Sequence, residues 1–238
     1  MTKKTLLISG GNGRLASELQ RQAAKYGHSA VCLDIDKMDV TDKADIDNAI
    51  LVYKPDVFIH CAAILDGTKT ALALEVNITG TVNVVLSCFK YNVKLIYLST
   101  DYVYPKARLN HAEEDPLLPF TLYGWTKLGG ECAVRTYPNS LIIRGAMCPR
   151  PYPHKAAYTD VKKNLIYQDE VAGYILQLLN ETGVINVGKK QSYSLYDFAQ
   201  KTREDVQPAT SPQEYEPKHS HLSVSKLHGA LRKTALSC

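Results

Sequence analysis

The chain has 238 residues, of which 45% are hydrophobic and 22% are charged, as is ordinary for a soluble globular protein with one sizeable core. It contains no run of about 18 apolar residues, so no membrane span is expected. A formal net charge of +4 is too small to indicate a nucleic-acid-binding surface. The six cysteines show neither a CxxC pair nor metal-ligand spacing, so we expect no metal site and a reducing, cytoplasmic location.

Short apolar segments alternate with helical segments through the first part of the chain. In chain order we expect a strand at 5–11, a helix at 14–27, a strand at 29–34, a helix at 42–54, a strand at 56–63, a helix at 72–92, a strand at 94–100, a helix at 122–137 and a strand at 140–146. The strands are apolar along their whole length, which is typical of a parallel sheet covered on both faces. The sequence therefore predicts an α/β fold with a Rossmann-like, doubly wound parallel sheet, in which ligands bind beyond the carboxyl ends of the strands.

The alternation weakens after residue 146. We expect a proline-rich loop at 148–160, a helix at 168–180, a strand at 183–188, a helix at 194–201, a loop at 207–221 and a final helix at 223–234. Ser194 and Asp197 form a capping box at the start of one of these helices. We predict a dinucleotide-binding Rossmann domain at 1–146, and at 147–238 a small, reduced substrate-binding lobe that is interleaved with the core.

A glycine turn follows the first predicted strand and opens the first predicted helix. In "ISGGNGRLA", Gly10 permits a tight turn, Gly13 lets a diphosphate approach the backbone, and Ala16 keeps the helix close to the sheet. The N-terminus of that helix offers unpaired N–H groups to phosphates. Because the pattern lies within a βαβ unit, it indicates dinucleotide binding rather than a merely structural turn.

Two residues bear on which dinucleotide is bound, and they point in opposite directions. Asp34 ends the second strand, where an acid can hold an adenosine ribose and repel a 2′-phosphate. Arg14 stands in the glycine turn and could attract that phosphate. Asp34 also has an interpretation as an ordinary turn residue, so the choice between NADP(H) and NAD(H) stays open.

Tyr123 and Lys127 are four positions apart on a predicted helix and should share one face. A phenol is a poor proton donor or acceptor near neutral pH, and an adjacent ammonium favours its ionised form and lowers its pKa. Thr100 ends the fourth predicted strand and could hydrogen-bond the same carbonyl oxygen. The pair alone is common by chance; together with the glycine turn and Thr100, it indicates acid–base catalysis.

Six segments occur in the order found in the extended short-chain dehydrogenases/reductases: "SGGNGRLA", "LDIDKMDVTD", "PDVFIHCAA", "VNITGTVN", "LSTDYVY" and "YGWTKLGGE". Among these, the chain is most similar to the dTDP-4-dehydrorhamnose reductases, which carry very similar "STDYVF" and "YGxTKLxGE" segments. The resemblance covers residues 4–146 well. It is looser over "INVGKKQSYSLYDFA" and the late "LSVSKL".

This resemblance implies an NAD(P)H-dependent reduction of the C4 ketone of a nucleotide-linked 4-keto-6-deoxy sugar. It assigns proton donation to Tyr123, tuning of that tyrosine and binding of the nicotinamide ribose to Lys127, and orientation of the ketone to Thr100. Asp101 is expected near the sugar. The cofactor contacts that we expect, from the glycine turn and the resemblance together, are Gly10, Asn12, Gly13, Arg14, Leu15, Asp34, Asp39, Val40, Ala62, Ala63, Ile64, Leu98, Tyr123 and Lys127.

The residues after Thr100 narrow the chemistry that the resemblance implies. Related sugar dehydratases carry a second carboxyl where this chain has Tyr102, and related epimerase–reductases carry a cysteine where it has Asp101. Dehydration and built-in epimerisation are therefore disfavoured. Met147 stands where the family usually has a tryptophan near the sugar, so we expect Thr100, Asp101 and Met147 to bind substrate.

Several alternatives stay open. A non-catalytic, cofactor-binding subunit that resembles the regulatory subunit of methionine adenosyltransferase would suit a reduced lobe, and a nucleotide-sugar epimerase is a further possibility. Asn77 matches a family residue that helps to place the lysine through water, or it caps a local backbone kink. His154, Lys155 and Lys162 are interpreted as surface charges rather than diphosphate ligands. We expect a nucleotide-diphosphate sugar and a second copy of the chain as partners.

Overall fold

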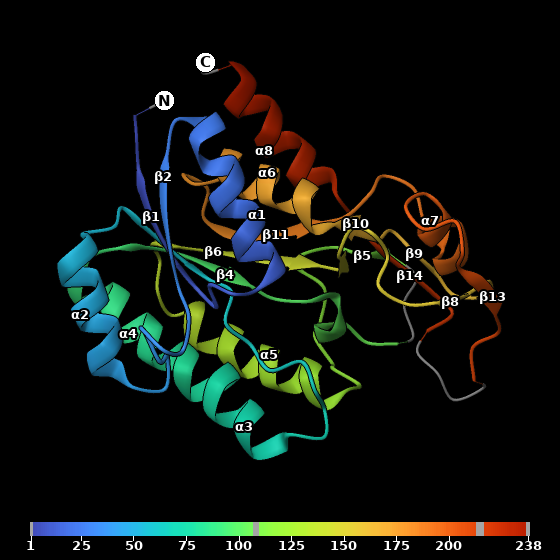
Figure 1. Ribbon diagram of the computed structural model, residues 1–238, viewed down its shortest axis with the longest axis horizontal. Helices are drawn as coiled ribbons and strands as arrows, with labels where there is room; N and C mark the ends of the chain where they lie inside the picture. The colour runs from blue at the N-terminus through green and yellow to red at the C-terminus, as the bar shows by residue number, and fades with distance from the viewer. Residues whose placement is uncertain (1, 107–109, 213–216, 237–238) are drawn as a thin grey trace.

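A six-stranded parallel sheet forms the centre of the protein, in the computed structural model that describes residues 2–106, 110–212 and 217–236. The strand order is β11-β6-β4-β3-β1-β2, with parallel pairing throughout (Figure 1). The strands are β1 (Thr5–Ser9), β2 (Ser29–Leu33), β3 (Val57–His60), β4 (Lys94–Leu98), β6 (Ser140–Gly145) and β11 (Gly183–Val187). This order confirms the predicted doubly wound fold.

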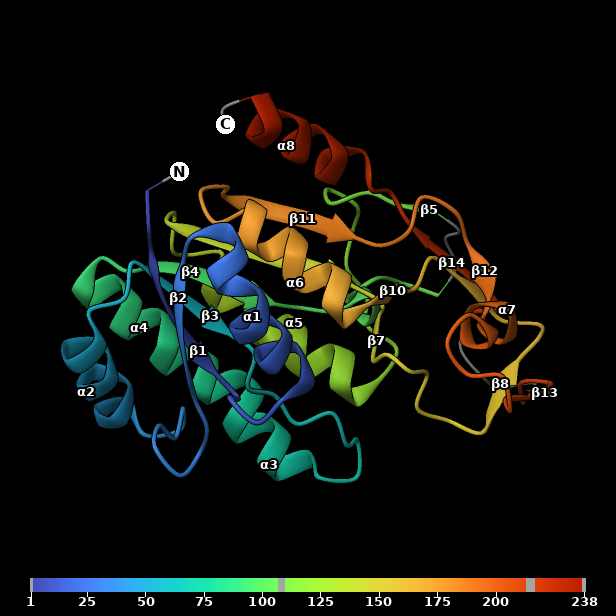
Figure 2. The same ribbon diagram turned by 45° about the horizontal axis from the view of Figure 1, so that its top comes forward.

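Helices cover both faces of this sheet (Figures 1 and 2). One layer contains α1 (Arg14–Ala23), α6 (Gln168–Gln177) and α8 (Ser225–Leu236), and the other contains α2 (Lys43–Tyr53), α3 (Thr70–Leu74), α4 (Thr81–Tyr91) and α5 (Leu122–Val134). Leu6 and Ile8 of β1 belong to the first core cluster, whereas Leu7 between them belongs to the second. Because successive strand side chains point to opposite faces, burial on both explains why the strands are continuously apolar.

The helical run from Thr70 to Tyr91 differs from the single regular helix expected at 72–92. A π-helical segment, η2 (Glu75–Gly80), joins α3 to α4. Within the described part of the chain this is the one run that is long and apolar enough to cross a membrane, by length and composition alone, and 44% of its most apolar window is buried. Its buried side chains pack against the sheet, as those of core helices in globular proteins do. This packing agrees with the expectation that the chain has no membrane span, which stays a prediction.

The C-terminal part of the chain adds small sheets beside the ends of the central strands (Figures 1 and 2). One has the order β12-β9-β14-β5, and two-stranded sheets join β10 to β7 and β13 to β8. The remaining elements are η1 (Ala24–Tyr26), η3 (Asp101–Val103), β5 (Asn110–His111), β7 (Met147–Cys148), β8 (Ala156–Tyr158), β9 (Lys162–Lys163), β10 (Ile166–Tyr167), β12 (Tyr193–Ser194), α7 (Leu195–Gln200), β13 (Gln207–Ala209) and β14 (His219–Leu222).

The loops predicted at 148–160 and 207–221 are wrong in part, because they contain β8, β13 and β14. Strands of two to four residues are too short to show a hydrophobic period, and each forms only when a distant segment pairs with it. Residues 213–216 of the second predicted loop lie outside the described residues. The N-cap half of the predicted capping box is confirmed, since the Asp197 backbone N–H donates to Ser194 Oγ at 2.9 Å.

Candidate active site

The glycine turn lies where β1 meets α1, at the carboxyl end of the sheet. Gly10 has a φ of +68°, which side-chain-bearing residues rarely adopt, and a Cβ added there would lie 2.9 Å from Ala62. The Gly13 N–H donates to the Gly10 carbonyl at 2.9 Å, which closes the turn. No side chain caps α1, so its first N–H groups remain available to an anion at the cavity that Arg14 and Leu15 help to line.

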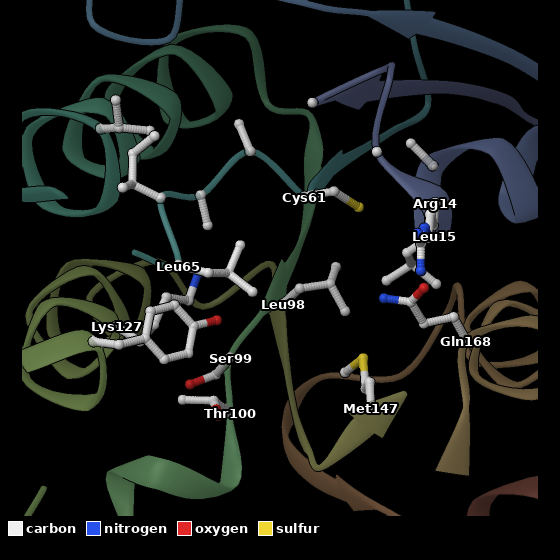
Figure 3. A pocket seen from close by; sticks show the side chains of 18 of the residues that line it. Arg14, Leu15, Cys61, Leu65, Leu98, Ser99, Thr100, Lys127, Met147 and Gln168 are labelled. Atoms are coloured by element: carbon white, nitrogen blue, oxygen red, sulfur yellow. The ribbon is translucent and has the colours of Figure 1, made fainter. Parts of the chain in front are cut away.

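A cavity of about 610 Å³ runs from this turn to the end of β4. Arg14, Leu15 and Gln168 lie on one side of it, and Lys127 and Thr100 lie on the other (Figure 3). Of the predicted site residues, those that line the cavity are Gly10, Gly13, Arg14, Leu15, Asp34, Asp39, Val40, Ala62, Ala63, Ile64, Leu98, Thr100, Asp101, Tyr123, Lys127 and Met147. Asn12 is exposed and is not among the lining residues.

The proposed catalytic residues reach the cavity from two elements. Thr100 follows β4 and caps η3, where its Oγ1 accepts from the Tyr102 backbone N–H at 3.2 Å. Tyr123 and Lys127 are on α5, which begins after Thr121, whose side chain caps the helix by accepting from the Gly124 N–H. Spacing of four residues on this helix places both side chains on the cavity face, as predicted.

Lys127 is an almost fully buried lysine, with 2% of its surface exposed. Its Nζ lies 4.1 Å from the ring centroid of Tyr97, and the Tyr97 hydroxyl donates to the Lys127 carbonyl at 3.1 Å. Burial lowers the pKa of Lys127 to about 7, although Cys61 and Glu131 act in the opposite direction. The ammonium is therefore poised between its charged and neutral forms near neutral pH.

The pKa of Tyr123 moves in the opposite direction from the one predicted. The sequence predicts that Lys127 lowers it, whereas burial, with the nearby Asp101 carboxylate, raises it above the ordinary value of a phenol. The physical reason is that both withdrawal from water and a neighbouring anion disfavour the phenolate. Tyr123 is consequently protonated at neutral pH, which is the form that a proton donor requires.

Asn77 supports the cavity from the π-helical segment η2. Its side chain bonds both the N–H and the carbonyl of Ile64, at 2.8 and 2.9 Å, and donates to Thr126 Oγ1 at 2.9 Å. It thus ties a segment that lines the cavity to α5, one residue before Lys127. Its position inside the π segment agrees with the interpretation as a residue at a backbone kink.

A buried ion pair fixes α5 against the strand ends. Glu131 and Arg144 are both fully buried and joined by two hydrogen bonds, and Ser99 Oγ donates to Glu131 at 2.9 Å. Burial opposes ionisation, but Arg144 and Ser99 hold the pKa of Glu131 below its usual range. Since Ser99 directly precedes Thr100, this contact fixes α5 relative to the end of β4. A Cβ added at Gly130 would lie 2.6 Å from the Asn77 carbonyl, so only glycine allows this close helix packing.

The two residues that bear on the cofactor line the cavity from different elements. Asp34 directly follows β2 and lines the cavity there. Arg14 lies beside Gln168, at the start of α6 (Figure 3). Burial raises the pKa of Cys148 to about 11, and the positive charge of Arg14 partly offsets this rise. Because Cys148 belongs to β7 and Gln168 begins α6, Arg14 lies close to both elements.

Some lining side chains were not singled out from the sequence: Ile35, Met38, Cys61, Leu65, Val76, Lys163, Leu165 and Gln168. Cys61 lies near the end of a predicted strand, and because ligands bind beyond the carboxyl ends of parallel strands, its position could have been found from the sequence. Lys163, Leu165 and Gln168 belong to the C-terminal part, where no motif marks them. Among the described residues, no group of His, Cys, Asp and Glu side chains could hold a metal ion, and Cys32, Cys61, Cys88, Cys132 and Cys148 are free thiols.

Fold and site together define a Rossmann-like α/β protein in which a glycine turn and a tyrosine–lysine pair open into one cavity. The profile of the family described as RmlD substrate binding domain matches residues 4–149. The chain therefore belongs to this family, which confirms the resemblance seen in its motifs.

Individual relatives agree with this assignment. The dTDP-4-dehydrorhamnose reductase of Mycobacterium tuberculosis is 34% identical over 152 residues, which are 59% of this chain and 49% of the relative, so the match spans about half of that protein. The spore coat polysaccharide biosynthesis protein SpsK of Bacillus subtilis is 27% identical over 224 residues, 84% of this chain and 77% of the relative. A crystal structure of the Bacillus anthracis dTDP-4-dehydrorhamnose reductase with NADP aligns with a TM-score of 0.85 and 22% identity, over 100% of this chain and 99% of that one. The last similarity confirms the fold.

Proposed function

We propose that the protein is an NAD(P)H-dependent reductase of the C4 ketone of a nucleotide-linked 4-keto-6-deoxy sugar, in deoxysugar biosynthesis. One observation carries this proposal: Thr100, Tyr123 and Lys127 line the same cavity as the glycine turn. A reductase needs a proton donor close to a cofactor site, and this cavity joins the two. The names of the relatives favour the same reaction.

The residues around the glycine turn fit a nicotinamide dinucleotide. The left-handed Gly10 brings the backbone close to Ala62, and α1 begins at the cavity without a side-chain cap. These are the features that a diphosphate needs. When bound, the cofactor supplies a hydride. Asp34 suits an adenosine ribose, and Arg14 lies on the side of α6, so both NADP(H) and NAD(H) fit this account.

Tyr123 is the proton donor in this proposal. Its raised pKa keeps the hydroxyl protonated until negative charge develops on the ketone oxygen. Lys127, with a pKa lowered to about 7, lies on the same face and can offset the phenolate charge as the proton leaves. Thr100 Oγ1 is at the cavity wall; its hydroxyl donates to Asp101 Oδ1 in the structure and can rotate to donate to the ketone oxygen when the sugar binds.

The sugar end of the cavity is formed by Asp101, Met147 and side chains from the C-terminal part of the chain. Because Tyr102 supplies no second carboxyl, the end of β4 lacks the acid–base pair that a dehydratase needs. Residues 147–238 would then serve as the substrate-binding lobe while β11, α6 and α8 remain part of the sheet and its cover. The family and its relatives do not favour a regulatory subunit or an epimerase.

An absorbance assay tests this proposal. The protein is incubated with NADPH or NADH and a panel of dTDP- and UDP-linked 4-keto-6-deoxyhexoses, and loss of the reduced nicotinamide band is followed. We expect turnover with at least one ketosugar, and a fall in kcat of about 10²–10⁴-fold in Tyr123→Phe with little change in cofactor affinity. Tight cofactor binding without oxidation of any panel member would contradict the proposal and favour a regulatory subunit.

We further propose that the protein acts in the cytoplasm as a homodimer, free of membrane and nucleic acid. Large apolar side chains are exposed on the adjacent helices α2 and α4, among them Val52 and Phe89, which are 71% and 68% exposed. Such a face suits a second copy of the chain. Sedimentation should give twice the chain mass for the wild type and the monomer mass for Phe89→Glu; a wild-type monomer at micromolar concentration would rule the dimer out.

A further inference from the structure

Lys163 is a buried lysine at the sugar end of the cavity. It lies in β9, in the C-terminal part of the chain, yet its side chain lines the same cavity as Thr100 and is only 5% exposed. Lysines are almost never buried unless they are paired, because withdrawal of an ammonium from water is strongly unfavourable. The neighbouring Lys162 points outward and is exposed, as alternation along a strand requires.

The partners of Lys163 are the two residues that follow the catalytic threonine. Its Nζ lies 3.4 Å from Asp101 Oδ2 and 4.5 Å from the ring centroid of Tyr102. The Tyr102 ring in turn meets the Tyr123 ring edge-to-face, with centroids 6.4 Å apart and an interplanar angle of 86°. One ammonium therefore contacts both an acid beside Thr100 and an aromatic ring against the proton donor.

Asp101 is held from two sides. Thr100 Oγ1 donates to its Oδ1 at 3.3 Å, while Lys163 engages Oδ2. A carboxylate has about four lone-pair sites, so Asp101 can still accept a hydrogen bond from a sugar hydroxyl. Without Lys163, the carboxylate would be a buried charge that lacks its cation, and its side chain would move towards water.

The backbone of Lys163 is also fixed. β9 pairs with β14, where Lys163 lies opposite Ser220, and with β12, where it lies opposite Tyr193. A side chain on a strand that is paired on both edges is positioned more firmly than one on a loop. The C-terminal part of the chain thus presents a fixed cation to the end of β4.

We propose that Lys163 is a positioning residue for the sugar: it keeps the Asp101 carboxylate in place beside Thr100, and it holds the Tyr102 ring against Tyr123. The inference rests on the proposed function, because the sugar is the ligand that Asp101 would meet. In this proposal a residue of the C-terminal part positions the residues that follow β4. Lys163 acts through Asp101 and Tyr102 and takes no part in proton transfer.

The kinetic test compares Lys163→Met, which keeps the apolar stem, with Lys163→Arg, which keeps the charge. We expect Lys163→Met to raise the KM of the ketosugar by about tenfold or more with a smaller change in kcat. The contact that is lost would stabilise the bound sugar equally in the ground state and in the transition state. NADPH affinity should stay within about twofold of wild type, because the glycine turn is remote from Lys163. Lys163→Arg should recover most of the loss, since a guanidinium can also pair with Asp101 and stack on Tyr102.

Lys162→Met is the matched control, because it removes the adjacent, exposed charge, and its KM should equal that of the wild type. An unchanged sugar KM in Lys163→Met would overturn the inference. So would a parallel loss of sugar and NADPH affinity, which would indicate general loosening of the fold. Failure of Lys163→Arg to recover any of the KM loss would also count against it.

A double-mutant cycle in urea unfolding separates this inference from the proposed function. Lys163→Met, Asp101→Asn and the double variant give the coupling between the two side chains without any turnover. A coupling near zero would overturn the inference whether or not the wild type reduces ketosugars. A clear coupling supports the pairing, and a wild type that then reduces no ketosugar would overturn the proposed function alone.

Discussion

The two ends of the cavity are built in different ways. The cofactor end consists of backbone and small side chains from the first βαβ unit, with Gly10 and the start of α1 at its centre. The sugar end consists of buried polar and charged side chains, among them Asp101 and Lys163, that come from segments far apart in the chain. The first is a local motif, and the second exists only in the folded protein. Cofactor binding should therefore depend mainly on backbone conformation, and sugar binding mainly on the charged side chains.

The largest expected effect concerns the ion pair that joins α5 to the strand ends. Arg144→Met removes the buried cation of Glu131 and leaves only the half-exposed Arg135 paired with that carboxylate, so it should lower the free energy of unfolding by about 3–5 kcal/mol in urea titrations. Arg135 contacts the same carboxylate but is 46% exposed, so Arg135→Met should lower it by less than about 1 kcal/mol. Equal losses in the two variants would show that burial does not distinguish them.

Gly10→Ala tests the backbone sensitivity of the cofactor end. The new Cβ meets Ala62 at 2.9 Å in a left-handed conformation, so we expect a loss of more than about 2 kcal/mol in unfolding free energy, together with weaker NADPH binding. Gly27 has a similar φ of +76° with open space around it, and Gly27→Ala should cost about 1 kcal/mol and leave NADPH affinity unchanged. NADPH titration and urea unfolding measure both; similar NADPH affinities in the two variants would remove the special role of Gly10.

The pH dependence of stability tests the burial of Lys127. Its folded pKa is about 7 and its unfolded value is near 10.4, so between these values the unfolded chain binds the extra proton. Wild-type stability should therefore rise with pH relative to Lys127→Met, by up to about 1.4 kcal/mol per pH unit. At pH 6 the variant should be the more stable protein, and the difference should shrink towards pH 9. A difference that is independent of pH would mean that Lys127 keeps an ordinary pKa.

The smallest expected effect is on cofactor affinity, and it tests whether Arg14 discriminates between NADPH and NADH. Since Arg14 lies towards α6 and β7, Arg14→Ala should weaken NADPH and NADH by a similar factor of about 3–10, as loss of one exposed charge-assisted contact to a diphosphate would. Fluorescence titration with both cofactors measures this. Selective weakening of NADPH would instead assign Arg14 to the 2′-phosphate, which is one of the two possibilities that the sequence leaves open.

The contrast between a local motif at the cofactor end and a sugar end assembled only by folding explains how much could be predicted from the sequence. The parallel sheet, the glycine turn and the placing of Tyr123 and Lys127 on one helix face follow from local patterns, and the structure brings them to one cavity. The direction of the Tyr123 pKa did not follow, because it depends on burial and on Asp101, which only the folded chain brings near. Lys163 could not be found, because nothing in "VKKNLIY" shows which lysine points inward.

The most direct test of the central claim follows the hydride itself. The protein is supplied with the ketosugar and with NADPH that carries deuterium at C4 of the nicotinamide, on each face in turn, and the product is analysed by mass spectrometry. The account predicts one deuterium at C4 of the sugar from one of the two labelled cofactors, in the wild type and hardly at all in Tyr123→Phe. NADPH that remains fully labelled beside unreduced ketosugar, with the cofactor bound, would contradict it.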